Sequence, residues 1–182
     1  MAQRPPIERI PAIALPLQAI QSNSLEDTVQ RLWEAIAGAW FPVLDGYNCR
    51  SKAATLTNNN MPDIVVIQIC VPAHGPANRY FERCILQIEC KRPSLDTPTQ
   101  WDNTIKGQFL DDLVATSNAS NRLYGAVAIG KKVQFFRFDG TQMQSLTPLS
   151  PEPFDLTTTP GLRQLERMMD YVKSTGWQWA GA

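Results

Sequence analysis

The chain has 182 residues, of which 43% are hydrophobic and 19% charged, which is enough to bury a single core. Lys plus Arg number 17 and Asp plus Glu number 17, so no global positive field attracts a polyanion and any nucleic-acid contact has to be local. A single histidine argues against zinc sites and catalytic triads built on histidine. No apolar stretch has membrane-spanning length, and we expect an intracellular protein, cytoplasmic or nuclear.

The first part of the chain predicts an arm followed by a helix. Residues 1–21 are rich in proline, and residues 4–16 predict an extended arm, either disordered or lying as a strap over a neighbour. From Ser24, a candidate N-cap, apolar residues recur at helical spacing as far as Trp40. Glu26 borders this apolar stripe and Glu34 lies nearly opposite it, so we choose Glu26 as a candidate acidic residue.

Two apolar runs predict neighbouring strands with polar residues at their ends. Pro62 and Asp63 open the run at residues 64–69, and Glu89-Cys90-Lys91 closes the run at residues 84–88. Alternate side chains of a strand point to opposite faces, so Glu89 and Lys91 share one face. If the strands are neighbours, Asp63 and Glu89 can hold a divalent cation between hard oxygen ligands, with the Cys90 main-chain carbonyl as a further ligand. The alternative, without a functional site, is a turn at Asp63 and a solvent-exposed Glu89–Lys91 pair on an edge strand.

The connections and the second half of the chain complete an α/β pattern. Residues 51–60 predict a loop beside the site, and residues 72–79, which include His74, predict a hairpin connection. A helix is expected from about residue 101 to 119, in which Gln108 either reaches the site or is a half-exposed polar residue. Two strands at residues 123–129 and 133–138 follow, joined by a tight turn, and then a last amphipathic helix pinned by Trp177 and Trp179. We therefore expect one domain at residues 22–182, with a central mixed sheet flanked by helices.

The Asp strand followed by the Glu-x-Lys strand resembles the PD-(D/E)XK nuclease superfamily, which includes restriction endonucleases. The order of motifs is similar to that of Holliday-junction resolvases: a helix with an early glutamate, the Asp strand, the Glu-x-Lys strand, a helix and a further strand. The resemblance implies a restriction endonuclease-like fold. It assigns Asp63 and Glu89 to metal binding, Lys91 to catalysis and Glu26 to a supporting acidic position.

The expected activity is a Mg²⁺- or Mn²⁺-dependent hydrolysis of phosphodiester bonds in DNA or RNA, by an endonuclease rather than an exonuclease. The metal neutralises developing charge and activates water, while Lys91 orients or deprotonates that water, provided that burial lowers its pKa. Expected nucleic-acid contacts are Arg50, Lys52, Arg92 and Lys106. Two alternatives remain: a catalytically silent nuclease-fold module that binds nucleic acid or a protein partner, and a nuclease that acts only as a homodimer or in a larger assembly.

Overall fold

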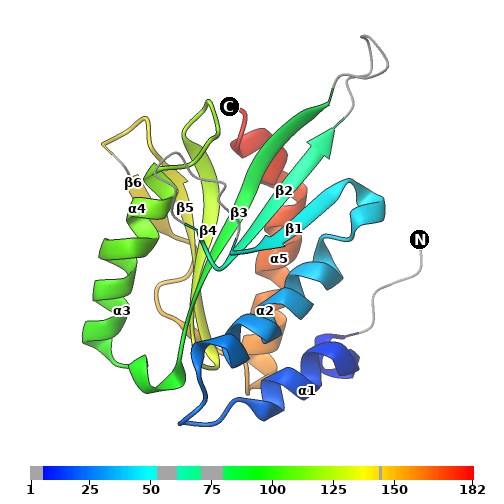
Figure 1. The fold of residues 1–182 in the computed structure, drawn as a ribbon, viewed down its shortest axis with the longest axis vertical. Helices are drawn as coiled ribbons and strands as arrows, with labels where there is room; N and C mark the ends of the chain where they lie inside the picture. The colour runs from blue at the N-terminus through cyan, green and yellow to red at the C-terminus, as the bar shows by residue number, and fades with distance from the viewer. Residues whose placement is uncertain (1–5, 53–60, 71–79, 144) are drawn as a thin grey trace.

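A mixed sheet lies between two layers of helices in the computed structural model, which describes residues 6–52, 61–70, 80–143 and 145–182 (Figure 1). The strands follow one another across the sheet in chain order: β1 (Tyr47–Ser51), β2 (Ile64–Cys70), β3 (Phe81–Lys91), β4 (Arg122–Ile129), β5 (Lys132–Asp139) and β6 (Ser145–Pro148), with the short β7 (Phe154–Asp155) beside β5. Neighbouring strands are antiparallel except β3 and β4, which are parallel. The expected α/β class with a mixed sheet flanked by helices is confirmed.

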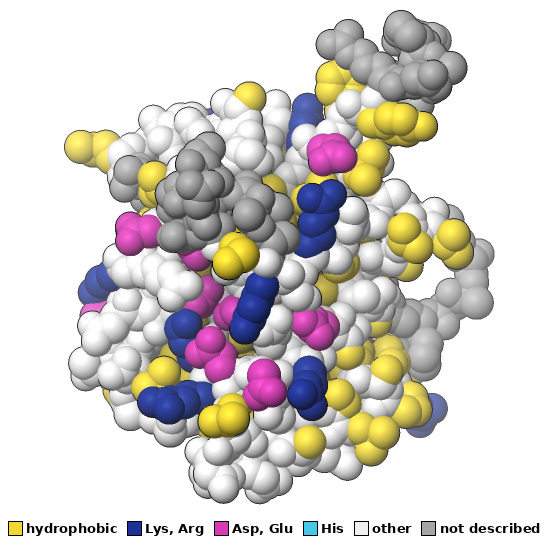
Figure 2. Space-filling view, viewed as in Figure 1, with side chains coloured by type: hydrophobic (Ala, Val, Ile, Leu, Met, Phe, Trp, Pro, Cys, Tyr) yellow, Lys and Arg dark blue, Asp and Glu magenta, His cyan; other side chains and the backbone are white. Residues whose placement is uncertain are grey.

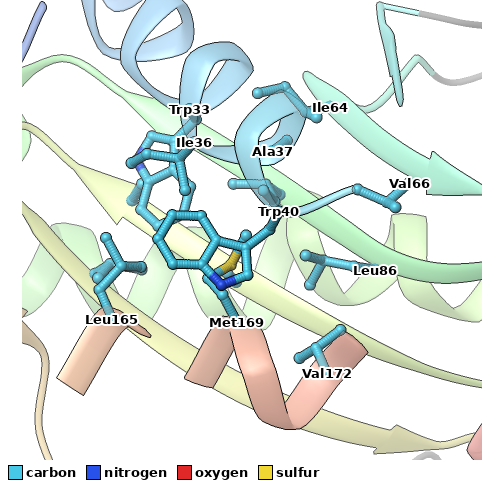
Figure 3. Packing of buried hydrophobic residues seen from close by; sticks show 14 of the residues in the cluster. Trp33, Ile36, Ala37, Trp40, Ile64, Val66, Leu86, Leu165, Met169 and Val172 are labelled. Atoms are coloured by element: carbon cyan, nitrogen blue, oxygen red, sulfur yellow. The ribbon is translucent and has the colours of Figure 1, made fainter. Parts of the chain in front are cut away.

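One face of the sheet is covered by α1 (Pro11–Ala19), α2 (Glu26–Trp40) and α5 (Thr159–Trp179). Trp33 and Trp40 of α2 lie fully buried between the sheet and Leu165, Met169 and Val172 of α5 (Figure 3). The Trp40 indole donates a hydrogen bond to Asp170 at 2.9 Å, which satisfies its buried N–H. This face holds the larger apolar core of the protein.

The other face is covered by the crossover that joins the parallel strands. It consists of a 3₁₀ turn (Pro93–Leu95), α3 (Pro98–Thr104), a π-helical turn (Ile105–Phe109) and α4 (Leu110–Val114). Trp101, Phe109 and Leu113 pack on a second apolar cluster that includes Val65 and Val127. A parallel pair needs such a crossover, because its connection must return along the whole strand length.

The described part of the predicted extended arm, from residue 6 onward, is largely helical. Residues 11–19 form α1, and Ile13 and Ile20 are buried in the main core. Pro11 stands at the first helical position, where its missing N–H costs nothing, and burial of the isoleucines compensates the hydrogen bond that Pro16 removes.

The start of α2 also differs from the sequence expectation. Leu25, not Ser24, occupies the N-cap position and makes no side-chain capping bond. The Ser24 hydroxyl instead accepts a hydrogen bond from the Gln21 amide at 2.8 Å. Ser24 therefore closes the preceding turn and leaves the first turn of α2 without a side-chain cap.

The last part of the chain follows the expectation closely. The turn between β4 and β5 places Gly130 at φ +59°, and the final helix α5 runs through Trp177 and Trp179. The Trp179 indole donates to the Leu123 carbonyl at 3.3 Å, which pins the end of α5 to the sheet. Residues 53–60 of the predicted loop and the predicted connection at 72–79 with His74 lie outside the described residues. Within the described ranges, no helix combines the length and the apolar character needed to cross a membrane.

Candidate active site

Asp63, Glu89 and Lys91 meet at one end of the sheet. Because β2 and β3 are antiparallel, with Ile64 opposite Ile88, the residue before β2 lies beside the last residues of β3. The Asp63 carboxylate accepts a hydrogen bond from the Cys90 amide at 2.8 Å, and the Lys91 ammonium donates to Glu89 Oε1 at 2.5 Å. Ile88 and Cys90 lie in the core on the α2 side, so Glu89 and Lys91 leave the strand on the α3–α4 side. The convergence expected from the sequence is present in the fold.

Glu26, at the start of α2, reaches the same place from another element. Its Oε2 atom lies 3.7 Å from Lys91 Nζ. Its side chain is 40% exposed, and it lines an open hollow of about 550 Å³ together with Leu25, Asp27, Lys91, Arg92 and Leu95. Glu34 accepts from Ser51 at 2.6 Å instead, away from Lys91. In the view of Figure 2, acidic and basic side chains are interspersed over this region of the surface.

Burial dominates the electrostatics of Glu89. Loss of solvent raises the pKa of Glu89 to about 7, which the hydrogen bond and charge of Lys91 partly oppose and the charges of Asp63 and Asp112 reinforce. Without a bound cation, Glu89 is therefore close to half protonated at neutral pH. A carboxylate in this state gains full ionisation when a cation joins it.

Lys91 has a raised pKa, which differs from the lowered pKa that a general base needs. Burial lowers the pKa of Lys91, but the hydrogen bond to Glu89 and the charges of Glu89, Glu26 and Asp63 together outweigh burial. In the cation-free protein Lys91 is thus an ammonium that donates, and it does not take a proton from water.

Asp112 of α4 is a site residue that sequence reasoning missed. It is 1% exposed, and its charge raises the pKa of Glu89. Gln108, which was expected to reach the site, is instead exposed on the π-helical turn. Buried positions step by five residues from Thr104 to Phe109, because the turn is kinked at Gly107, whose φ of −101° and ψ of −119° are not helical, and the buried face then continues through Asp112. The sequence feature that could have identified Asp112 is an acidic residue three positions after Phe109 and next to Leu113, within an apolar helical stripe.

The expected nucleic-acid contacts lie at different distances from this centre. Arg92 lines the hollow beside Lys91, and the Lys52 amide donates to the Asp63 carbonyl at 3.1 Å, so both border the site. Arg50 stands opposite Val65 and shares its face of the sheet, which is the face of Glu89. Lys106 is exposed on the crossover and pairs with Asp102 at 2.6 Å.

The donor chemistry of the site fits a hard divalent cation. Asp63 and Glu89 supply carboxylates, and the Cys90 backbone lies against Asp63. Around them, the carboxylates of Glu26, Asp63 and Glu89 act on the ammonium of Lys91, and the charge of Asp112 acts on Glu89. Among the described residues, however, no group of three or more His, Cys, Asp or Glu side chains already has metal-binding geometry. The excess of negative charge therefore favours a cation, while the carboxylates have to reorient to bind it.

Searches of protein-family models, of curated proteins and of solved structures find no match to this chain.

Proposed function

We propose that this protein is a divalent-cation-dependent nuclease that hydrolyses phosphodiester bonds in DNA or RNA. The observation that carries the proposal is the meeting of Asp63, Glu89 and Lys91 from two antiparallel strands on one face at the end of the sheet. Two acids and a lysine at a sheet end are the groups that metal-assisted attack on a phosphodiester requires.

The order of elements supports a PD-(D/E)XK-type fold. A helix that carries Glu26 is followed by the antiparallel strands β1, β2 and β3, then by the α3–α4 crossover, and then by β4 parallel to β3. This is the order of motifs in the resolvase-like proteins that the sequence resembles. Its agreement with the position of the three polar residues favours a nuclease over a chance Glu-x-Lys motif.

In the proposed mechanism, Asp63, Glu89 and the Cys90 carbonyl would hold the cation, which would supply charge neutralisation and activation of water. Lys91 has two roles that depend on Glu89. While Nζ donates to Glu89, it stays protonated and can stabilise negative charge on phosphate oxygens. If the Glu89 oxygen turned away, Lys91 would lose the largest of the contacts that keep its pKa high; Nζ would first release its proton to solvent and only then, as the neutral amine, accept a proton from water.

The test is cleavage of supercoiled plasmid, single-stranded DNA and RNA by pure protein in Mg²⁺, in Mn²⁺ and in EDTA. We expect cleavage that needs the cation, and a loss of about 10²- to 10⁴-fold in Lys91→Ala. Lys173→Ala is the matched control, because Lys173 lies on α5, on the other side of the sheet from α3 and α4. Its Nζ atom pairs with Asp45 Oδ2 at 2.9 Å. Cutting of closed plasmid circles identifies an endonuclease. Equal cleavage by wild type and Lys91→Ala would contradict the assigned mechanism.

A silent nuclease-fold module is the second candidate, and the 2.5 Å ion pair between Lys91 and Glu89 favours it, since this pair is satisfied without a cation. Thermal unfolding with Mn²⁺ separates the two. A nuclease gains melting temperature with Mn²⁺ and loses that gain in Asp63→Ala, whereas a silent module shows no gain.

A further inference from the structure

Four polar side chains are buried between the sheet and α4, and we call them the buried polar layer: Asp63, Gln87, Glu89 and Asp112. They are 7%, 2%, 2% and 1% exposed, respectively. The proposed function uses Asp63 and Glu89 and leaves Gln87 and Asp112 without a role. An unpaired buried polar group is costly to keep, so the Gln87 amide in particular requires an explanation.

The strand register and the helix place Gln87 and Asp112 in the same part of the α3–α4 face as Glu89. Gln87 precedes Glu89 by two residues on β3 and leaves the strand on the same face, opposite Gly125 of β4. A Cβ at Gly125 would lie 2.5 Å from Phe109 Cζ and 3.2 Å from Leu113 Cδ2, so α4 lies directly over this part of the sheet. Asp112 is the neighbour of Leu113 on that helix, and its charge acts on Glu89.

The Gln87 amide has no hydrogen-bond partner among the described residues, at either its nitrogen or its oxygen. Burial raises the pKa of the nearby Cys84 thiol to about 12, and the Gln87 side chain opposes this rise as a polar neighbour of the thiol, although neither amide atom meets hydrogen-bond geometry. A thiol is in any case a weak acceptor. An unpaired buried amide destabilises a fold, and an apolar side chain of the same shape would avoid that cost.

The chemistry of the layer indicates what the amide serves. Ionised Asp63, Glu89 and Asp112 can only accept hydrogen bonds, and Gln87 is the one member of the layer that has N–H groups to donate. An N–H donor that lies among three carboxylates stabilises them when all three are ionised. A bound divalent cation creates that condition.

We propose that Gln87 and Asp112 are positioning residues of the cation site: the Gln87 amide orients the Glu89 and Asp112 carboxylates, and Asp112 adds negative charge behind Glu89. This inference rests on the proposed function. Groups of this kind, which hold metal ligands without touching the metal, typically change metal affinity about 10- to 100-fold when they are replaced.

The test is calorimetric titration of Mn²⁺ into the full chain without nucleic acid. We expect Gln87→Met and Asp112→Asn each to bind Mn²⁺ about 10- to 100-fold more weakly than wild type. Gln134→Met is the matched control, because Gln134 is buried on the neighbouring part of the same face but donates to the Ser150 carbonyl at 3.0 Å. We expect the control to keep the wild-type affinity.

A second measurement separates positioning from a merely structural role. Urea unfolding of the cation-free protein should show Gln87→Met at least as stable as wild type, and cleavage assays should show a higher half-saturating Mn²⁺ concentration at an unchanged KM for DNA. Wild-type Mn²⁺ affinity in both Gln87→Met and Asp112→Asn, or a loss of cation-free stability in Gln87→Met, would overturn the inference. A wild-type protein that neither binds Mn²⁺ nor cleaves nucleic acid would instead overturn the proposed function itself.

Discussion

The two faces of the sheet bury side chains of different kinds. On the α2–α5 face, the buried cluster is apolar and contains Trp33, Trp40 and Phe135. On the α3–α4 face, a smaller apolar cluster surrounds the buried polar layer, with Glu89 and Asp112 almost fully buried. Apolar burial stabilises a fold, whereas neighbouring buried carboxylates oppose it. The α2–α5 face therefore stabilises the fold, whereas the buried carboxylates on the α3–α4 face reduce its stability.

The largest expected effect is on the apolar face. Trp33→Ala should lower the free energy of unfolding by about 3–5 kcal/mol, because it removes a fully buried indole. This indole packs edge-on against the Phe135 ring, with 6.1 Å between the ring centroids. Urea unfolding measures the loss. Trp177→Ala, which removes a half-exposed indole beneath Arg83, is the control and should cost clearly less. Equal losses in the two variants would show that the α2–α5 face is not the main source of stability.

The pH dependence of stability tests the polar face. The pKa of Glu89 rises from 4.5 in the unfolded chain to about 7 in the folded protein, which corresponds to about 3 kcal/mol. Between these two pH values the unfolded chain holds fewer protons than the folded protein, so stability falls as pH rises from 4.5 to 7 and stays low above it. Urea unfolding in EDTA at pH 4.5, 6 and 8 should show this fall.

Glu89→Gln should remove most of that pH dependence and leave the protein more stable than wild type at pH 8, because the amide carries no charge to bury. A wild-type stability that is flat or rising across this window, in the absence of divalent cations, would contradict the account of Glu89.

Crowding under α4 should give a smaller effect. Gly125→Ala places a methyl group 2.5 Å from Phe109 Cζ, and we expect a loss of about 1–3 kcal/mol as α4 is displaced. Gly38→Ala is the matched control: nothing lies within 4 Å of its Cβ, and it replaces a glycine inside α2. That control should stabilise the protein by about 1 kcal/mol. A neutral Gly125→Ala would mean that α4 does not press on the sheet as the structure indicates.

The smallest effect concerns an ion pair on the surface of the α3–α4 side. Lys132 and Asp96 lie 2.8 Å apart with side chains 42% and 31% exposed. Solvent screens such a pair, so Lys132→Ala should change the free energy of unfolding by less than about 1 kcal/mol. Thermal melts at low and high salt measure it. A larger change, or one that persists in high salt, would indicate that this pair is part of the site.

Much of the fold could be read from the sequence where the pattern was strong. The strands around residues 64–69 and 123–129 have continuous apolar runs, and the last helix has clear helical spacing, so tertiary contacts reinforce the local preference. The shared face of Glu89 and Lys91 follows from strand alternation alone.

The remainder depended on tertiary packing. The prolines at residues 11 and 16 hid α1 from sequence analysis, because Ile13 and Ile20 gain their burial from tertiary packing in the main core. The kink at Gly107 takes Gln108 off the buried face and brings Phe109 onto it over Gly125, a contact between residues distant in the chain. The sign of the Lys91 pKa shift required the distance to Glu89, which no sequence pattern supplies.

The central claim is that the acids at the junction of β2 and β3 bind a divalent cation. The most direct measurement is the anomalous difference density of a crystal soaked in Mn²⁺. The account predicts one peak bound by both Asp63 and Glu89, with the Lys91 ammonium moved away from Glu89 Oε1. A soaked crystal with no peak there, and with the 2.5 Å contact between Lys91 and Glu89 intact, would contradict it.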